Sequence, residues 1–154
     1  MVPLVAKHAV DLFPLLSDAN LYSYTQEEPP GSIVALRERF HFLESRRSPD
    51  GSQAWLNWMV RELKTHEAIG YVQATVGAAG ADIAWVVGTD YQRLGYATEA
   101  SSAMVMWLRS SGANEVRAKI GPTHFASQRV AAKVGLSQTG EVAEGEEVWA
   151  SIQE

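Results

Sequence analysis

The sequence predicts a mixed α/β fold with a central, largely antiparallel sheet, one parallel strand-helix-strand step and helices on both faces. Residues 9–43 repeat apolar side chains at helical spacing, whereas residues 54–87 alternate with the period of two that is typical of strands. From residue 82 to 120 the order becomes strand, helix, strand, which favours a right-handed parallel crossover. A chain of 154 residues can bury roughly two-thirds of its unfolded surface, so we expect one domain over 1–154.

The first half of the chain predicts a short strand at 2–5, two helices and a three-stranded meander. Each helix has one apolar face, made by Ala9, Leu12, Phe13 and Leu16 and then by Ile33, Leu36, Phe40 and Leu43. Ser32 is the expected N-cap of the second helix, and Arg39 is expected on its solvated face. The meander strands are expected at 54–62, 69–76 and 82–87.

The second half predicts a long helix over 98–111, then strand, helix and hairpin. The expected apolar face of the long helix comprises Ala100, Ala103, Met104, Trp107 and Leu108. Gly112 suits the left-handed turn that ends a helix. A strand at 116–120, a helix at 125–133 and a hairpin of 136–142 and 147–152 complete the order.

Composition excludes several kinds of site. The chain has no cysteine, which removes disulfides, thiolate metal sites and a cysteine nucleophile, and its four histidines lack the spacing of a metal site. The net charge of −5 argues against nucleic-acid binding and fits an amine-bearing substrate. No stretch resembles a membrane helix or a secretory signal, so we expect a cytoplasmic protein without a membrane partner.

The turn between the strand that ends at Val87 and the long helix is the candidate anion site. The strand breaks at Gly88, and the loop that follows contains Gln92-x-x-Gly95-x-Ala97 before the helix opens. A helix start has unpaired backbone N–H groups and the positive end of the helix dipole, which together suit a phosphate. Small residues at 95 and 97 let a ligand approach the backbone.

This loop, in its place after a meander, resembles the acyl-CoA loop of the GNAT superfamily of N-acetyltransferases, written Arg/Gln-x-x-Gly-x-Gly/Ala. The run Gly95-Tyr96-Ala97-Thr98-Glu99-Ala100 is similar to the wording of the Rim-type branch, named for enzymes that acetylate ribosomal-protein N-termini. A second block, 124–136, is similar to that branch's Asn-x-x-Ser…Lys-x-Gly-Phe segment. In this chain His124 stands for the Asn and Leu136 for the Phe.

The resemblance implies that acetyl-CoA is the co-substrate and that the acetyl group moves directly to a neutral primary amine. A backbone N–H near Val87 would help the tetrahedral oxyanion. Homodimers are a family-level expectation. The residues that the resemblance assigns to the CoA donor are Trp85, Val86, Val87, Gln92, Arg93, Leu94, Gly95, Tyr96, Ala97, Thr98, His124 and Ser127.

The catalytic and acceptor residues carry weaker signals. Ser127 matches the serine of the family segment and is the candidate general acid toward the leaving thiolate; capping the helix start is the alternative. Asp82 is the candidate base, although alternation sets it on the face opposite Trp85. The candidate acceptor-binding residues are Glu27 and Glu28 in a loop and Trp55, Asn57, Gln73 and Trp85 in the strands, with Tyr71 at the same parity.

The acceptor itself is left open among a protein N-terminus, a free amino acid and a small amine. A non-catalytic acyl-CoA-binding module is the alternative function, since no base is evident and His124 departs from the family pattern. A general nucleotide-binding domain is disfavoured, because neither Gly-x-x-x-x-Gly-Lys-Ser/Thr nor Gly-x-Gly-x-x-Gly is present.

Overall fold

The structure, a computed structural model, describes residues 1–151 and has the predicted order of elements. Short 3₁₀ turns at Ala6–His8, Ala19–Tyr22 and Thr89–Tyr91 link some of them. The strands and helices are β1 (Val2–Pro3), α1 (Ala9–Leu16), α2 (Ile33–Leu43), β2 (Ala54–Arg61), β3 (Ala68–Gly77), β4 (Gly80–Val87), α3 (Tyr96–Ser110), β5 (Val116–Ile120), α4 (Phe125–Lys133), β6 (Leu136–Ala143) and β7 (Glu146–Ser151). The predicted end of the last strand at Ile152 lies outside the described residues.

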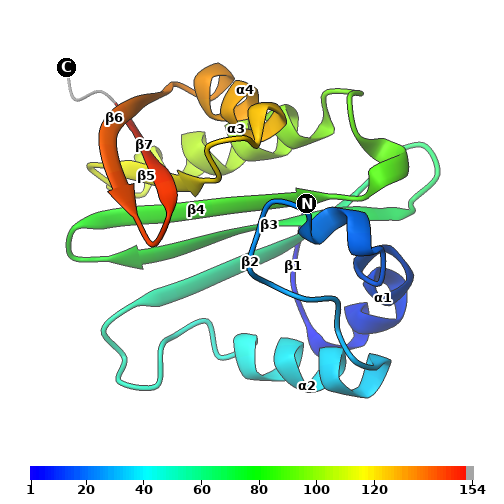
Figure 1. The fold of residues 1–154 in the computed structure, drawn as a ribbon. Helices are drawn as coiled ribbons and strands as arrows, with labels where there is room; N and C mark the ends of the chain where they lie inside the picture. Colours follow the sequence, from blue (N-terminus) through cyan, green and yellow to red (C-terminus); the bar gives the residue numbers. More distant parts are fainter. Residues whose placement is uncertain (152–154) are drawn as a thin grey trace.

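One sheet with the strand order β1-β2-β3-β4-β5-β7-β6 organises the described part of the chain. Every neighbouring pair is antiparallel except β4 and β5, which are parallel, as the strand-helix-strand pattern predicted. Helices α3 and α4 cover one face of the sheet and α1 and α2 cover the other (Figure 1). The mixed α/β fold with one parallel step is therefore confirmed.

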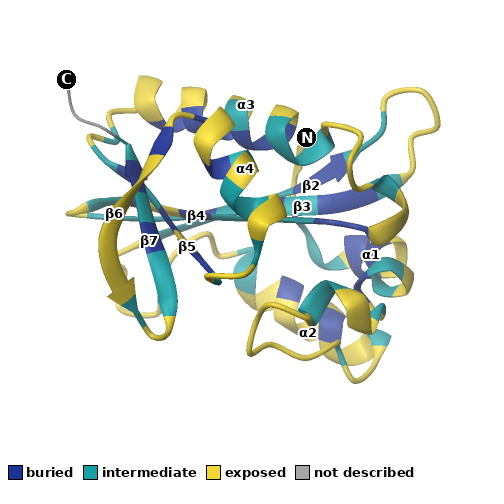
Figure 2. Ribbon diagram, turned by 45° about the horizontal axis from the view of Figure 1, so that its top comes forward, coloured by how far each residue is buried: buried dark blue, intermediate teal, exposed yellow. Residues whose placement is uncertain are grey.

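Two apolar clusters form, one on each face of the sheet (Figure 2). On the α3 side Val72, Ala74 and Ile83 of the sheet pack with Met104 and Leu108 of α3. On the α1 and α2 side the buried members are Leu4, Ala9, Leu12, Leu16, Leu36, Phe40 and Met59, with Tyr71 and Val86 packed against them. The alternation of β3 and β4 thus sends successive side chains into different clusters.

The predicted apolar face of α3 was partly wrong. Ala103 is exposed and Trp107 is 49% exposed, whereas Ser101 and Val105 are buried. The buried stripe is therefore centred between Ser101 and Leu108, and Trp107 lies at its margin, edge-on to Trp58 with ring centroids 5.6 Å apart. The predicted cap of α2 is confirmed, because Ser32 Oγ accepts a hydrogen bond from the N–H of Ala35 at 3.0 Å.

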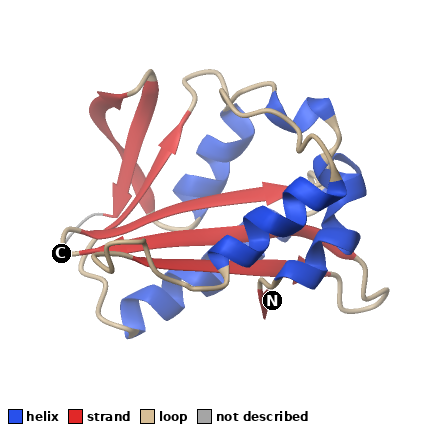
Figure 3. Cartoon of the chain, turned by 90° about the horizontal axis from the view of Figure 1, so that it is seen from below, coloured by secondary structure: helices blue, strands red, loops and turns tan. Residues whose placement is uncertain are grey.

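The sheet opens between β4 and β5. The two strands pair only at Ala81 with Val116 and at Asp82 with Arg117, and β5, β7 and β6 then turn away from the rest of the sheet (Figure 3). None of the helices within residues 1–151 is long and apolar enough to cross a membrane.

Candidate active site

The edge of β4 that faces β5 carries free backbone groups. Gly88 N–H donates to Ile69 O of β3 at 2.9 Å, and the alternation of the backbone then directs the N–H and C=O of Trp85 and Val87 away from β3. Ala81, which has the same parity, donates to Glu115 O at 2.9 Å on the β5 side. Beyond Asp82 no β5 residue pairs with this edge, so Trp85 presents its N–H and C=O, and Val87 its N–H, to the opening between the strands. Val86 instead turns its peptide groups toward β3.

The loop after β4 is shaped to gather backbone N–H groups. Arg93 and Gly95 both adopt positive φ, 65° and 88°, and Gly95 is the N-cap of α3 without any side-chain cap. Within residues 1–151, no acceptor is hydrogen-bonded to the amides of Tyr96, Ala97 or Thr98 at the helix start. Alternating left-handed residues before a helix make a concave arrangement of donors that suits an anion.

Gly95 is needed for its backbone shape and for open space. A Cβ added at Gly95 would meet no protein atom within 4 Å, so packing of the protein does not demand glycine here. The positive φ does favour glycine, and the empty space leaves the helix start accessible. The residues present therefore fit a phosphate group at this position.

The Gln92 side chain was expected beside the bound donor, but it points to the end of β4. Its Nε2 donates to Val87 O at 3.0 Å, so the side chain caps the carbonyl at the end of β4 and does not extend toward the helix start. The glutamine of the motif thus ties the loop to the end of β4. The backbone of residues 93–98, rather than the Gln92 amide, forms the anion-friendly surface.

Two tyrosines brace this loop against the turn between β2 and β3. Tyr96 donates to Glu62 Oε1 at 2.5 Å, and Tyr91 donates to Glu67 Oε2 at 3.0 Å. The hydrogen bond to Glu62 raises the pKa of Tyr96, and the same bond lowers the pKa of Glu62. Both tyrosines therefore remain neutral donors at physiological pH.

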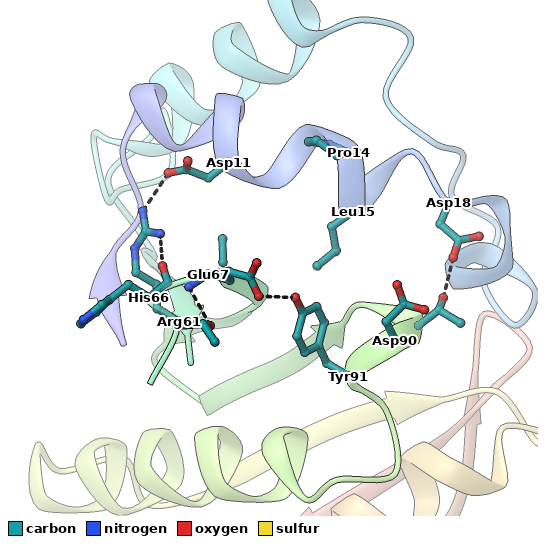
Figure 4. A pocket seen from close by; sticks show the side chains of 12 residues that line it. Asp11, Pro14, Leu15, Asp18, Arg61, His66, Glu67, Asp90 and Tyr91 are labelled. Atoms are coloured by element: carbon teal, nitrogen blue, oxygen red, sulfur yellow. Dashed lines mark hydrogen bonds and ion pairs between the residues drawn. The ribbon is translucent and has the colours of Figure 1, made fainter. Parts of the chain in front are cut away.

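A hollow of about 570 Å³ lies beside the loop, on the α1 side (Figure 4). Its polar wall is tied together by Arg61 with Asp11 at 2.7 Å and by the bond between Tyr91 and Glu67. Arg61, Asp11 and Glu67 therefore each have a partner within the wall. Sequence patterns did not predict the hollow, because its lining comes from three separate stretches of the chain, 11–18, 61–68 and 89–91.

The start of α4 carries a histidine, a serine and a tyrosine in contact. Ser127 Oγ lies 3.3 Å from His124 Nε2, and the ring of His124 stacks on Tyr24 with centroids 4.4 Å apart and planes inclined by 7°. Burial lowers the pKa of His124, which is neutral at pH 7 as a result. Ser127 does not cap α4: no side-chain cap bond forms at its N-terminus.

Residues 18–31, here called the bridging loop, join the ends of the two diverging strands. At one end Thr89 Oγ1, just after β4, donates to Asp18 Oδ2 at 2.6 Å. At the other end Tyr24 stacks on His124 and its carbonyl lies against Gly121, just after β5. The loop therefore spans the open end of the gap between β4 and β5. The bridging loop contains no sequence motif. Its role is visible only in the contacts that Asp18 and Tyr24 make with residues far away in the chain.

Four of the predicted strand residues do share one face. In the register of the sheet Asn57 lies opposite Gln73, Trp55 opposite Thr75 and Met59 opposite Tyr71, all on the α1 and α2 side. A small hollow on this face is lined by Arg39 of α2 together with Asn57, Tyr71 and Gln73. Arg39, expected only on a solvated face, therefore also borders the candidate acceptor surface.

The assignment of Trp85 to that same face was wrong. Trp85 lies opposite Val72 and packs in the α3 cluster, because its parity in β4 is that of Ile83 and not of Ala84. Register between strands, which the sequence does not contain, decides this. Only the backbone of Trp85 reaches the gap.

Asp82, Glu27 and Glu28 are exposed and lie apart from Ser127. Asp82 is at the paired end of β4, opposite Thr75 and on the face away from Trp85, as alternation predicted. Glu27 and Glu28 lie in the bridging loop, where the Glu27 carboxylate is close enough to raise the pKa of Tyr22 after the larger effect of burial. No hydrogen bond joins any of these acids to Ser127 within the described chain. Their catalytic and binding roles stay predictions.

Burial and charge also act on Tyr71 beneath the bridging loop. Burial raises the pKa of Tyr71 to about 12, so its phenol keeps its proton under physiological conditions. Within residues 1–151 no three His, Cys, Asp or Glu side chains are grouped as metal ligands.

Comparison with known proteins identifies the family. The family model described as acetyltransferase (GNAT) domain matches residues 1–137. No curated protein matches the sequence significantly.

Solved acetyltransferases share the fold at low identity. Spermidine N-acetyltransferase from Vibrio cholerae, in complex with CoA and spermine, is 15% identical with a TM-score of 0.79, covering 98% of this chain and 93% of that one. Ribosomal-protein-S5-alanine acetyltransferase from Vibrio fischeri is 14% identical with a TM-score of 0.79, covering 99% and 91%. The aminoglycoside acetyltransferase AAC(6')-Ib in complex with coenzyme A is 14% identical with a TM-score of 0.77, covering 98% and 92%. The chain belongs to the GNAT family of acetyltransferases.

Proposed function

We propose that the protein is an acetyl-CoA-dependent N-acetyltransferase that moves the acetyl group directly to a primary amine. The observation that carries this proposal is a pair of backbone surfaces with free groups, one at the open edge of β4 and one at the start of α3. A long donor with amides and phosphates can pair with both surfaces at once. The CoA-bound neighbours with the same fold support this reading.

The donor-binding roles divide between two surfaces. We assign the pyrophosphate to the backbone of residues 93–98 and the amides of the pantetheine arm to the peptide N–H and C=O of Trp85. The peptide N–H of Val87 in β4 would donate a hydrogen bond to the developing oxyanion, an arrangement that typically contributes about 3 kcal/mol to acyl transfer. Val86, which the resemblance also assigned to the donor, turns its peptide groups toward β3 and has none free for the pantetheine arm.

Transfer to an amine requires a neutral nucleophile and a proton for the leaving thiolate. An α-amino group with a pKa near 8 is roughly one-tenth neutral at pH 7, whereas a lysine is neutral about once in 2,500. Ser127 at the start of α4 is the proposed proton donor toward the thiolate. Asp82 lies on the same face of the sheet as Gln73 and is the candidate general base.

The acceptor class remains a primary amine of three kinds: a protein N-terminus, an amino acid or a small polyamine or aminoglycoside. The neighbours include one named for ribosomal-protein alanine, one bound to spermine and one bound to ribostamycin. The net charge of −5 favours a cationic acceptor over an anionic one.

A thiol-release screen tests this proposal. Acetyl-CoA would be incubated with amino acids, alanine-initiated peptides, spermine and ribostamycin, and free CoA thiol would be measured. Amine-dependent release establishes the transferase and excludes the non-catalytic acyl-CoA-binding module. Tight binding of acetyl-CoA with no release from any amine would instead favour the module.

A further inference from the structure

The start of α4 holds a neutral histidine, a hydroxyl and a covering aromatic ring that the donor-binding role does not use. His124 Nε2 is 3.3 Å from Ser127 Oγ, so this ring nitrogen faces the serine hydroxyl. One face of its ring is covered by Tyr24. His124 is half-buried. Its backbone N–H donates to Gly121 O at 2.9 Å, and this bond holds the residue in the position from which its ring contacts Ser127.

We propose that Ser127 and His124 form a proton shuttle in which the imidazole stores the proton that the amine loses and returns it to the thiolate. This proposal rests on the proposed function. It supplies the base that no carboxylate near Ser127 provides. It also gives the histidine that replaces the family's asparagine a task that an asparagine cannot perform, since an amide does not accept a proton near neutral pH.

The steps balance without any further reactant. The amine nitrogen bonds to the thioester carbon, and its ammonium proton passes to Ser127 Oγ while the serine's own proton passes to His124 Nε2. The C–S bond then breaks. The imidazolium returns its proton through Ser127 Oγ to the thiolate, so the products are the acetamide and the thiol, and both side chains end as they began.

The surroundings of His124 suit a neutral proton acceptor. The titratable group that faces the ring is the Tyr24 phenol of the bridging loop, and Ser127 faces it from α4, where the Gln128 side chain donates to Gly121 O and Pro122 O. Gln128 in turn donates to Glu147 of β7 at 3.3 Å. Burial alone lowers the pKa of His124, and no described charged side chain shifts it. His124 acts through Ser127 and is therefore a positioning residue rather than a catalytic one.

Tyr24 couples the shuttle to the bridging loop. The parallel stack holds the imidazole plane so that Nε2 points at Ser127. Because Tyr24 belongs to the loop that spans the gap, the shuttle is assembled only when that loop is in place. Tyr24→Phe keeps the stacking ring, whereas Tyr24→Leu removes it, and the pair forms a matched comparison.

Imidazole ¹⁵N NMR on the free protein tests the shuttle without any acceptor. We expect His124 at pH 7.5 to be neutral with its proton on Nδ1 and a bare Nε2, to titrate below pH 6.5, and to move toward its ordinary pKa in Tyr24→Leu but not in Tyr24→Phe. A charged ring at pH 7.5, or a proton on Nε2, would overturn the proposal. Titration of the same sample with acetyl-CoA reports separately on the proposed function, so the two failures are distinguishable.

Kinetics give the second readout, with spermine, ribostamycin and an alanine-initiated peptide as acceptors. Wild-type kcat should fall at low pH with the pKa that NMR assigns to His124, and His124→Asn should lower kcat about 10- to 100-fold and lose that acidic limb. If His124→Asn keeps the limb, or Asp82→Asn alone removes it, the shuttle is wrong.

Discussion

The two ends of the gap between β4 and β5 are built in different ways. At the donor end, the loop of residues 92–97 and the start of α3 form one continuous segment whose left-handed residues and free amides follow from local sequence. At the other end, the surface is assembled from the bridging loop, the turn after β5 and the start of α4, which meet only through Asp18, Tyr24 and His124. A motif can mark the first kind of site but not the second.

The first end is the proposed binding site of the acetyl-CoA donor, and the second end borders the proposed binding site of the amine acceptor. Changes at residues 93–98 should act on acetyl-CoA affinity. Changes in the bridging loop and on the face of Tyr71 should act on the acceptor or on turnover. Mutations should therefore alter the donor end without the acceptor end, and the reverse.

Gly95→Glu should abolish acetyl-CoA binding, with a loss of at least about 100-fold, or roughly 2.8 kcal/mol. The substitution places bulk and negative charge where the pyrophosphate is assigned. Gly112→Glu is the matched control, because Gly112 also has positive φ, 95°, and open space, but lies after the other end of α3. Isothermal titration should find wild-type affinity in the control. Equal loss in both variants would mean that backbone strain, not the site, is responsible.

Ser127→Ala should lower kcat about 10- to 100-fold, since a positioned proton donor typically contributes that much or more. The Kd for acetyl-CoA should change by no more than about two-fold, because the hydroxyl acts on the leaving thiolate and not on the phosphates. Thiol release and titration measure the two quantities. Ser137→Ala, on exposed β6, is the control. Unchanged turnover in Ser127→Ala would contradict the role of Ser127 as a proton donor and leave it a structural role.

The donor loop could be predicted from sequence because its determinants are neighbours in the chain. The order of elements, Ser32 as a cap and the parallel step are local or nearly local patterns, and all three are present. Trp85 was placed on the wrong face because register depends on pairing between strands. The contact of Tyr24 with His124 joins positions 100 apart, and no periodicity within either segment encodes it.

Tyr71→Phe should flatten the loss of stability at high pH while leaving acetyl-CoA affinity unchanged. Burial raises the folded-state pKa of Tyr71 to about 12 from an ordinary value of 10. The folded state therefore keeps a proton that the unfolded state releases, so this stability is complete below pH 10 and is lost as pH rises to 12. The difference is at most about 3 kcal/mol. Urea unfolding at pH 8 and pH 11 measures it, and parallel curves for both proteins would contradict the assignment.

Thr89→Val should have the smallest effect, raising the acceptor KM a few-fold, about 2 to 5, by releasing the bridging loop from the end of β4. The hydroxyl of Thr89 is the main cause that lowers the pKa of Asp18, so that pKa should rise toward its ordinary value in the variant. Carboxyl NMR follows the titration. Thr139→Val in β6, whose hydroxyl donates to Val148 O at 2.9 Å, is the comparison. A change in acetyl-CoA affinity instead of acceptor KM would place Thr89 at the donor end.

Titration of the wild-type protein with acetyl-CoA tests the central claim most directly. The free N–H groups at the open edge of β4 and at the start of α3 predict one binding site per chain with a Kd between about 1 μM and 1 mM, from which ATP displaces the donor less well than CoA does. Absence of binding in this range, or better competition by ATP than by CoA, would contradict the account.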